Sequence, residues 1–281
     1  MANFILSAFA DEYSPEFARQ LEGLAKFGIS KIEIRGVDGK NVSVLTADEA
    51  KNCKKMLDGA GMTLSAVGSP LGKISLDGDL DVHYELTRRV CETANIMDCT
   101  RIRAFSFYDT NGRRDEVIDR LGKLIDICKS EGVLLCHENE KGIYGDTAEK
   151  CLDLKNVYGD DLGVVFDHAN FIQCGCEPYP HAFDLLGGCV TYMHIKDATV
   201  EGTVVPAGEG IGRIAETLRE LDKRDGDLIL TLEPHLRVFG GLDELEHGEK
   251  TKVKGTYATA EEAFAASVEA ARNAILWAKS N

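Results

Sequence analysis

Ionisable side chains follow four successive strand patterns in the sequence from residue 132 onward. The apolar run "VLLCHENE" ends in two acids, and the next three runs end in an acid, in a histidine with a lysine, and in an acid with a histidine. Side chains two residues apart on a strand share a face, so each of these pairs is expected to point the same way. The residues are Glu138 and Glu140, Asp167, His194 and Lys196, and Glu233 and His235.

Four of these groups together suit a divalent cation. A single acid at a strand end is most often solvated or caps a helix, but ionisable groups that converge from four strands would repel and desolvate one another without a positive charge between them. Three carboxylates and one imidazole form a hard oxygen and nitrogen set, which favours Mn²⁺, Mg²⁺ or Co²⁺ over a thiolate-type zinc site. The sequence therefore predicts one metal ion held by Glu138, Asp167, His194 and Glu233.

The elements that would carry these residues alternate along the whole chain. Strand patterns cover 3–9, 30–36, 63–69, 100–107, 132–140, 162–170, 190–198 and 228–236, and helix patterns cover 14–28, 46–61, 81–97, 113–132, 146–159, 180–188, 211–226 and 258–281. Eight strand–helix units predict an α/β protein with one (β/α)₈ TIM barrel as a single domain over 1–281. A doubly wound sheet is the competitor, but no glycine-rich phosphate fingerprint follows the first strand.

Local signals mark two of the predicted helix starts. Thr46 and Glu49 have the spacing of a capping box, and Ser14 with Pro15 is typical of an N-cap followed by the first helical residue.

Composition narrows the class of partner. With 47 acids and 32 bases the net charge is −15, which disfavours nucleic acid and anionic membrane surfaces. No apolar run approaches the roughly 20 residues that span a bilayer, and the N-terminal segment lacks a basic, apolar leader. The nine cysteines are interpreted mainly as core residues in a reducing compartment, with Cys174 and Cys176 only a weak zinc signal. We expect a cytoplasmic protein.

The four motifs around the predicted ligands resemble those of the xylose isomerase-like TIM barrel superfamily, the sugar phosphate isomerase/epimerase group. They are "HENE" at Glu138, "FDHAN" at Asp167, "HIKD" at His194 and "LEPH" at Glu233. The resemblance covers essentially the whole chain. It implies a single divalent metal on these four residues, with Mn²⁺ favoured and Mg²⁺, Co²⁺ or Zn²⁺ as alternatives.

The resemblance also implies the reaction. In the epimerase branch the glutamates that match Glu138 and Glu233 act as acid and base on opposite sides of the substrate. A metal that grips a carbonyl acidifies the neighbouring C–H by stabilising an enediolate, and two flanking carboxylates then move the proton. Return to the opposite face gives an epimerase, and return to the neighbouring carbon gives an isomerase. The expected substrate is a small carbohydrate (ketose, sugar phosphate or inosose), and the expected assembly is a homo-oligomer, dimer or tetramer.

Two positions differ from the epimerase pattern. Asn170 stands three residues after Asp167, where those enzymes usually have histidine. They also usually have an arginine several residues after the histidine that matches His194, whereas here Lys196 and Asp197 come sooner and no arginine appears until Arg213. "HIKD" followed by "PAGEGIG" is similar instead to the broader isomerases and inositol-catabolism dehydratases of the superfamily.

Further residues are expected around the substrate. Lys196, His235, Arg35, Arg103 and Glu140 are predicted substrate-binding residues, with Lys196 placed to stabilise an oxyanion. His137 and His168 have the opposite strand parity and are expected to pack behind the ligands. The glycine-rich segment 206–212 either cradles an anion or forms a plain turn. The loop 236–256 is expected to cover the site or form an oligomer contact.

Three alternatives stay open. The same metal site suits a carbohydrate dehydratase or lyase, including the catalytic subunit of a C-glycoside-cleaving enzyme with a β-rich partner. An apurinic DNA endonuclease shares the barrel but needs more histidines and a less acidic surface. A sugar-binding protein without turnover is the non-enzymatic alternative.

Overall fold

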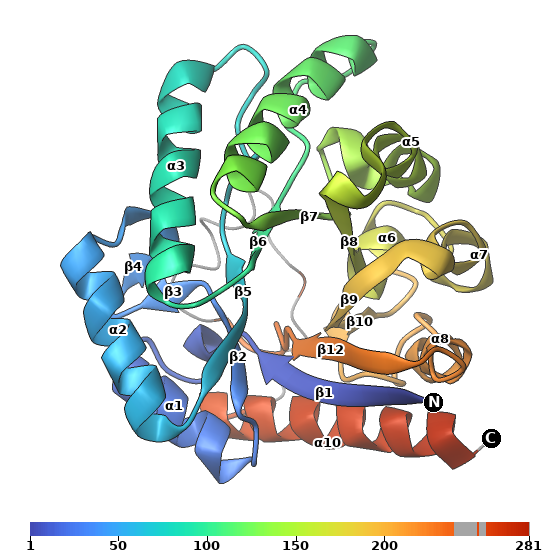
Figure 1. Cartoon of the computed structure of the whole chain (residues 1–281). Helices are drawn as coiled ribbons and strands as arrows, with labels where there is room; N and C mark the ends of the chain where they lie inside the picture. The colour runs from blue at the N-terminus through green and yellow to red at the C-terminus, as the bar shows by residue number, and fades with distance from the viewer. Residues whose placement is uncertain (239–251, 253–256, 281) are drawn as a thin grey trace.

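Eight parallel strands form the centre of the molecule. The structure, a computed structural model, describes residues 1–238, 252 and 257–280 (Figure 1). The strands follow the order β1-β12-β9-β8-β7-β6-β5-β2. Their bounds are β1 Ala2–Ala8, β2 Lys31–Ile34, β5 Thr63–Gly68, β6 Arg101–Ala104, β7 Leu134–Glu138, β8 Leu162–Asp167, β9 Val190–Ile195 and β12 Gly226–Leu232. The strands β1 and β2, at the two ends of this order, contact each other, so the sheet curves into a nearly closed barrel.

Helices surround the barrel and connect each strand to the next (Figure 1). They are α1 Phe17–Lys26, α2 Ala47–Ala60, α3 Leu80–Ile96, α4 Arg114–Ser130, α5 Ala148–Tyr158, α6 His168–Gln173, α7 Phe183–Leu186, α8 Ile214–Leu221 and α10 Ala260–Ser280. This is the predicted TIM barrel, with its strands and helices in the predicted alternation. That the whole chain forms one domain stays a prediction.

Short elements lie in the connections. Two small antiparallel pairs are β3 Gly36–Val37 with β4 Lys40–Asn41, and β10 Asp197–Ala198 with β11 Val204–Val205. Short helical turns are η1 Ala10–Glu12, η2 Val42–Val44, η3 Tyr144–Asp146, η4 Gly159–Asp161, η5 Pro178–Ala182 and η6 Gly187–Cys189. The helix predicted at 180–188 is therefore divided into η5, α7 and η6, and most of the loop predicted at 236–256 lies outside the described residues.

A local sequence signal predicts the start of helix α2 correctly but not that of α1. The capping box of α2 is confirmed, because Thr46 and Glu49 each accept a hydrogen bond from the other's backbone amide. The Ser14 prediction is wrong: α1 begins at Phe17, and the Ser14 hydroxyl accepts from the amide of Glu16. The Phe17 amide instead donates to Asp38, 21 residues away in sequence, so a tertiary contact replaces the local cap.

The core of the described residues has five parts, of which the two largest involve the barrel strands. The larger part fills the space between strands and helices and contains buried cysteines such as Cys91 and Cys128. A smaller cluster of side chains packs separately, and its members come from five of the barrel strands: Ala66, Cys136, Val165, Tyr192 and Ile229. Among the described residues all nine cysteines are free thiols, six of them buried. No helix in the described ranges is both long enough and apolar enough to cross a membrane.

Strand register brings the polar ends together. Asp167 on β8 lies opposite His194 on β9, and Thr231 on β12 lies opposite the same histidine. Glu233, two residues beyond Thr231, therefore comes level with Lys196, and its amide donates to the carbonyl of Ile195. The carboxyl ends of β7, β8, β9 and β12 thus meet at one mouth of the barrel.

Candidate active site

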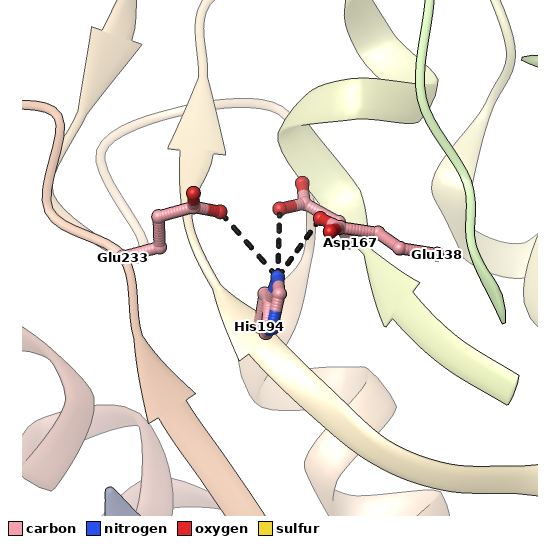
Figure 2. A group of neighbouring side chains, drawn as sticks. All are labelled: Glu138, Asp167, His194 and Glu233. Carbon is pink, nitrogen blue, oxygen red and sulfur yellow. Dashed lines mark hydrogen bonds and ion pairs between the residues drawn. The ribbon is translucent and has the colours of Figure 1, made fainter. Parts of the chain in front are cut away.

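Three of the four predicted metal ligands converge on one ring nitrogen of the fourth, His194. Figure 2 shows the carboxylates of Glu138, Asp167 and Glu233 turned toward His194. The Nδ1 atom of His194 lies 2.9 Å from Glu138 Oε1, 3.4 Å from Glu233 Oε2 and 3.9 Å from Asp167 Oδ2. One ligand atom from each residue lies within 4.8 Å of the others, and all four residues are buried. The structure therefore brings together the whole predicted set.

Burial and neighbouring charges shift the pKa values of these groups in opposite directions. Burial alone would raise the pKa of Glu138, but the positive charges of His194 and Arg103 outweigh it and hold that pKa at about 2. For Asp167, burial is the larger effect and raises the pKa to about 7. Burial would lower the pKa of His194, but Glu138 and Glu33 raise it well above its usual range. The cluster thus stabilises positive charge at its centre.

Lys196 supplies part of that positive charge. Its ammonium lies 3.1 Å from Asp167 Oδ2 and 2.9 Å from Glu233 Oε2, and its side chain is buried. Burial disfavours the charged amine, but the surrounding carboxylates raise its pKa above the ordinary value. Lys196 is therefore a buried cation that contacts one oxygen atom each of Asp167 and Glu233, two of the predicted metal ligands.

Two arginines hold the glutamates from outside. Arg35 Nη1 lies 3.1 Å from Glu233 Oε1, and Arg103 Nη1 lies 3.2 Å from Glu138 Oε2. Both guanidinium groups also lie over the ring of Phe9, at 4.3 and 5.1 Å from its centroid. Arg35 in addition binds Asp11 through two nitrogens, so this arginine links three segments as well as facing the site.

The donor set fits a hard divalent cation. Within the described part of the chain, Asp167 Oδ2 is buried beside the centre of the cluster and accepts no hydrogen bond, although it lies 3.1 Å from the Lys196 ammonium. Buried carboxylate oxygens without donors are costly and are expected where a cation binds. Three oxygen donors and one imidazole nitrogen within 4.8 Å of one another match the mixed set that Mn²⁺ or Mg²⁺ accepts.

A pocket lies over the cluster. Its wall contains both glutamates of the cluster and every predicted substrate-binding residue: Arg35, Arg103, Glu140, Lys196 and His235. Glu140 forms an ion pair with Lys73, 3.2 Å away, and His235 Nε2 lies 3.4 Å from both Glu233 and Glu12. Asp167 and His194 lie beneath this wall, so a ligand in the pocket would meet the glutamates and the cations first.

The two other histidines singled out in the sequence, His137 and His168, lie behind the site. His137 Nε2 is 3.0 Å from the Ser106 hydroxyl, and His168 Nε2 is 3.0 Å from the Thr217 hydroxyl. Both imidazoles are buried, and burial lowers the pKa of His137 to about 4 and that of His168 to about 3. Neither belongs to the pocket wall or to either of the two groups of possible metal ligands in the described ranges.

The glycine-rich segment 206–212 is a turn built around Asp197. The carboxylate of Asp197 accepts from the amides of Gly208, Gly210 and Gly212 and from that of Ala198. A Cβ atom at Gly210 would lie 2.3 Å from Asp197 Oδ1 and from Ala198 O, so only glycine allows this approach. Because the amides already bind a carboxylate, the interpretation as a cradle for an external anion is wrong.

Other residues of the site escaped the sequence analysis. Asn170 was noted there only as a difference from the epimerases. Its side-chain NH₂ group donates to Glu138 Oε1 and to the Asn139 carbonyl, and its backbone amide donates to the Asp167 carboxylate. Asn139 exchanges two hydrogen bonds with the backbone of Asp167. Glu33, an acid in the apolar run "KIEI" of β2, lies 3.2 Å from His194 Nε2. An acid inside an apolar strand was the one available signal for it.

Comparison with known proteins identifies the family. The model described as xylose isomerase-like TIM barrel matches residues 21–271, and the chain belongs to this family. No curated protein matches it. The family is one of enzymes, and the cluster and pocket occupy the end of the barrel where TIM-barrel enzymes carry their active sites.

Three solved structures share the fold at low identity. One is the probable 3-DHS dehydratase AsbF of petrobactin synthesis from Bacillus anthracis, with TM-score 0.72, 17% identity and coverage of 97% of this chain and 99% of that one. The IOLI protein with a binding zinc atom has TM-score 0.72 and 17% identity, over 96% and 98% of the chains. D-psicose 3-epimerase in the presence of D-fructose has TM-score 0.70 and 16% identity, over 98% of both. Similar folds therefore serve a dehydratase and an epimerase.

Proposed function

We propose that the protein is a divalent-metal-dependent isomerase or epimerase of a small carbohydrate. The observation that carries the proposal is the convergence of Glu138, Asp167, His194 and Glu233 beneath a polar pocket at the carboxyl ends of the strands. Family membership supports an enzyme, and the epimerase among the similar structures supports this reaction class.

Glu138 and Glu233 are the proposed acid and base. They approach His194 from β7 and from the end of β12, and both reach the pocket wall. Neighbouring positive charges keep the pKa of each carboxyl below its ordinary value, so both are ionised and one can accept a proton from the C–H beside a substrate carbonyl. The other must take up a proton from solvent before it returns one on the opposite side, and the first glutamate then releases its proton, so that the cycle gains and loses none. A cation held by the four residues would supply the charge that acidifies this C–H.

The remaining polar groups of the pocket are proposed to bind the substrate. Lys196 carries a buried positive charge beside Glu233 and would stabilise negative charge on a substrate oxygen. Arg35, Arg103, His235 and Glu140 would bind hydroxyl groups or a carboxylate from the wall. Asn170 holds Glu138 through Oε1, and so fixes the orientation of the proposed base.

A dehydratase or lyase is the second candidate. It is supported by the structural similarity to a probable dehydratase, by Asn170 at the position where the epimerases usually have histidine, and by the absence of an arginine between His194 and Arg213. Both reactions begin with removal of a proton beside a carbonyl, so the product distinguishes them. An elimination releases water or an aglycone, whereas an isomerisation keeps every atom of the substrate.

The test is proton exchange in deuterated water. Protein with Mn²⁺ is incubated with free and phosphorylated ketoses and inososes, and C–H exchange is followed by NMR. Metal-dependent exchange without loss of water supports the isomerase or epimerase, and the exchanged carbon separates the two. Product that has lost water supports the dehydratase. Absence of exchange on every substrate, with metal bound, would contradict the proposal and favour a partner-dependent lyase or a binding protein.

Variants test the acid and base. Glu138→Gln and Glu233→Gln should each lower kcat at least about hundredfold, the usual effect of a general acid or base. Glu140→Gln, a matched change of a pocket-wall carboxylate outside the cluster, should act mainly on KM. Near-normal turnover in either of the first two variants would remove that residue from the mechanism.

The finer expectations remain part of this proposal. Mn²⁺ is the favoured ion, with Mg²⁺, Co²⁺ and Zn²⁺ as alternatives. The proposed location is the cytoplasm, and the proposed assembly is a homodimer or homotetramer without nucleic acid or membrane partners.

A further inference from the structure

Glu33 is an acidic side chain inside the barrel. It lies on β2, is fully buried, and faces His194 and Tyr192 of β9 across the interior. Tyr192 itself belongs to the apolar interior cluster with Val165 and Ile229. A carboxylate in such surroundings is costly unless donors satisfy it. Glu33 is outside the pocket wall, so substrate contact does not account for its presence.

Two donors satisfy Glu33. Its Oε1 atom accepts from the Tyr192 hydroxyl at 3.0 Å, and its Oε2 atom lies 3.2 Å from His194 Nε2. A carboxylate only accepts hydrogen bonds, so the contact with Glu33 places a proton on Nε2; the contact with Glu138 places a second proton on Nδ1, and a bound cation would take the place of that second proton. The opposite ring nitrogen, Nδ1, is the one that faces Glu138, Asp167 and Glu233.

We propose that Glu33 is the positioning residue of the metal site, which fixes the His194 ring with Nε2 protonated and presents Nδ1 as a lone-pair donor to the cation. The role rests on the proposed metal site but not on the reaction proposed for it. Hydrogen bonds from a ligand histidine to a buried carboxylate orient the ring and raise its basicity.

The packing around His194 supports this role. The ring of Phe9 meets the imidazole edge to face at 5.1 Å between centroids, and the ring of Tyr192 does so at 5.6 Å. These contacts restrict the plane of the imidazole, but apolar rings do not distinguish one nitrogen from the other. With a cation in place of the Nδ1 proton, Glu33 would be the group that holds the remaining proton on Nε2.

The experiment measures ion binding and the tautomer separately. Glu33→Met removes the acceptor at similar volume and should weaken the Kd for Mn²⁺, measured by titration calorimetry, by about 10–100-fold. Glu33→Gln keeps one acceptor oxygen for Nε2 and a donor for the Tyr192 hydroxyl, so its loss should be smaller. Ser65→Ala is the matched control, because Ser65 forms an equally buried interior pair with Ser7 and should change the Kd less than twofold.

The second measurement is long-range ¹H–¹⁵N NMR of Mg²⁺-loaded, histidine-labelled protein, with His194 assigned by the signal missing from His194→Gln. The wild-type protein should show the Nε2-protonated tautomer. An Nδ1-protonated ring in the wild type would overturn the inference even if Glu33→Met does not fold. A wild-type Kd in a folded Glu33→Met protein would also overturn it. If the wild-type protein itself binds no cation, the proposed function falls together with this role.

Discussion

Replacement of Lys196 by methionine tests the charge balance of the site without any substrate. The ammonium lies about 3 Å from one oxygen each of Asp167 and Glu233, and an effective dielectric constant of about 20 gives roughly 5 kcal/mol of attraction per pair. Desolvation of the buried amine offsets much of this attraction. Removal of one partner from a buried ion pair typically costs about 3–5 kcal/mol, because the remaining charges stay buried without compensation. We expect Lys196→Met to lose about that much stability in the presence of a chelator.

A divalent cation should reverse the effect. In the variant, the carboxylates of Asp167 and Glu233 are free of the ammonium, and a bound ion no longer meets a neighbouring positive charge. We therefore expect Mn²⁺ to bind at least about tenfold more tightly to Lys196→Met than to the wild type. Each tenfold gain adds about 1.4 kcal/mol to the stabilisation by the ion at a fixed free concentration. The stability gap between the two proteins should narrow accordingly.

The assay is urea unfolding with EDTA and with Mn²⁺, together with a direct Mn²⁺ titration. Lys73→Met is the matched control, because Lys73 pairs with Glu140 in the same pocket without an ion-pair contact to the four ligands. It should cost about 1 kcal/mol under both conditions and leave the Kd unchanged. An equal loss of stability for Lys196→Met with and without Mn²⁺, and an unchanged Kd, would refute the reasoning.

Two further predictions concern stability outside the cluster. The two carboxylate oxygens of Asp197 accept from four backbone amides, and Asp197→Asn replaces one of these oxygens by an NH₂ group that faces amide donors. The free energy of unfolding measured in urea should therefore fall by about 2–4 kcal/mol. The control variant Glu209→Gln, in the same segment, should change it by less than about 0.5 kcal/mol. Burial lowers the pKa of His83 to about 4, from 6.5 in the unfolded chain. The unfolded state therefore binds more protons between these values, and the stability that neutral His83 contributes above about pH 6.5 is lost as the pH falls toward 4. This loss amounts to about 2 kcal/mol between pH 7 and pH 5, and His83→Gln should lack it.

The fold was predictable because its signals are local and repeated. Each strand and each helix carries its own hydrophobic periodicity, and few folds accommodate eight alternating strand–helix units. The convergence of Glu138, Asp167, His194 and Glu233 follows from the same logic, because residues at the carboxyl ends of parallel strands meet at one edge. Their roles as ligands and catalysts remain predictions, but their proximity could be foreseen without coordinates.

Contacts between distant segments could not be foreseen in this way. The amide of Phe17 finds its acceptor in Asp38, so the local Ser14 signal does not set the start of α1. The amides of 206–212 find theirs in Asp197, although glycine-rich turns before a helix also bind external anions. Glu33 and His194 are 161 positions apart and meet only when the barrel closes. In each case the partner is chosen by tertiary packing.

The two arginines explain how two of the three buried carboxylates, those of Glu138 and Glu233, are arranged around one centre. Arg103 binds Glu138 through Oε2, whereas Oε1 of that residue faces His194. Arg35 likewise binds Glu233 through Oε1, whereas Oε2 faces His194 and Lys196. Each guanidinium thus holds one oxygen of a glutamate and leaves the other for the middle of the cluster. A carboxylate with one oxygen held by an arginine cannot turn its second oxygen toward another donor at the periphery. The second oxygens of Glu138 and Glu233 therefore converge beside His194 Nδ1. Buried negative charges held in this way require a positive charge between them.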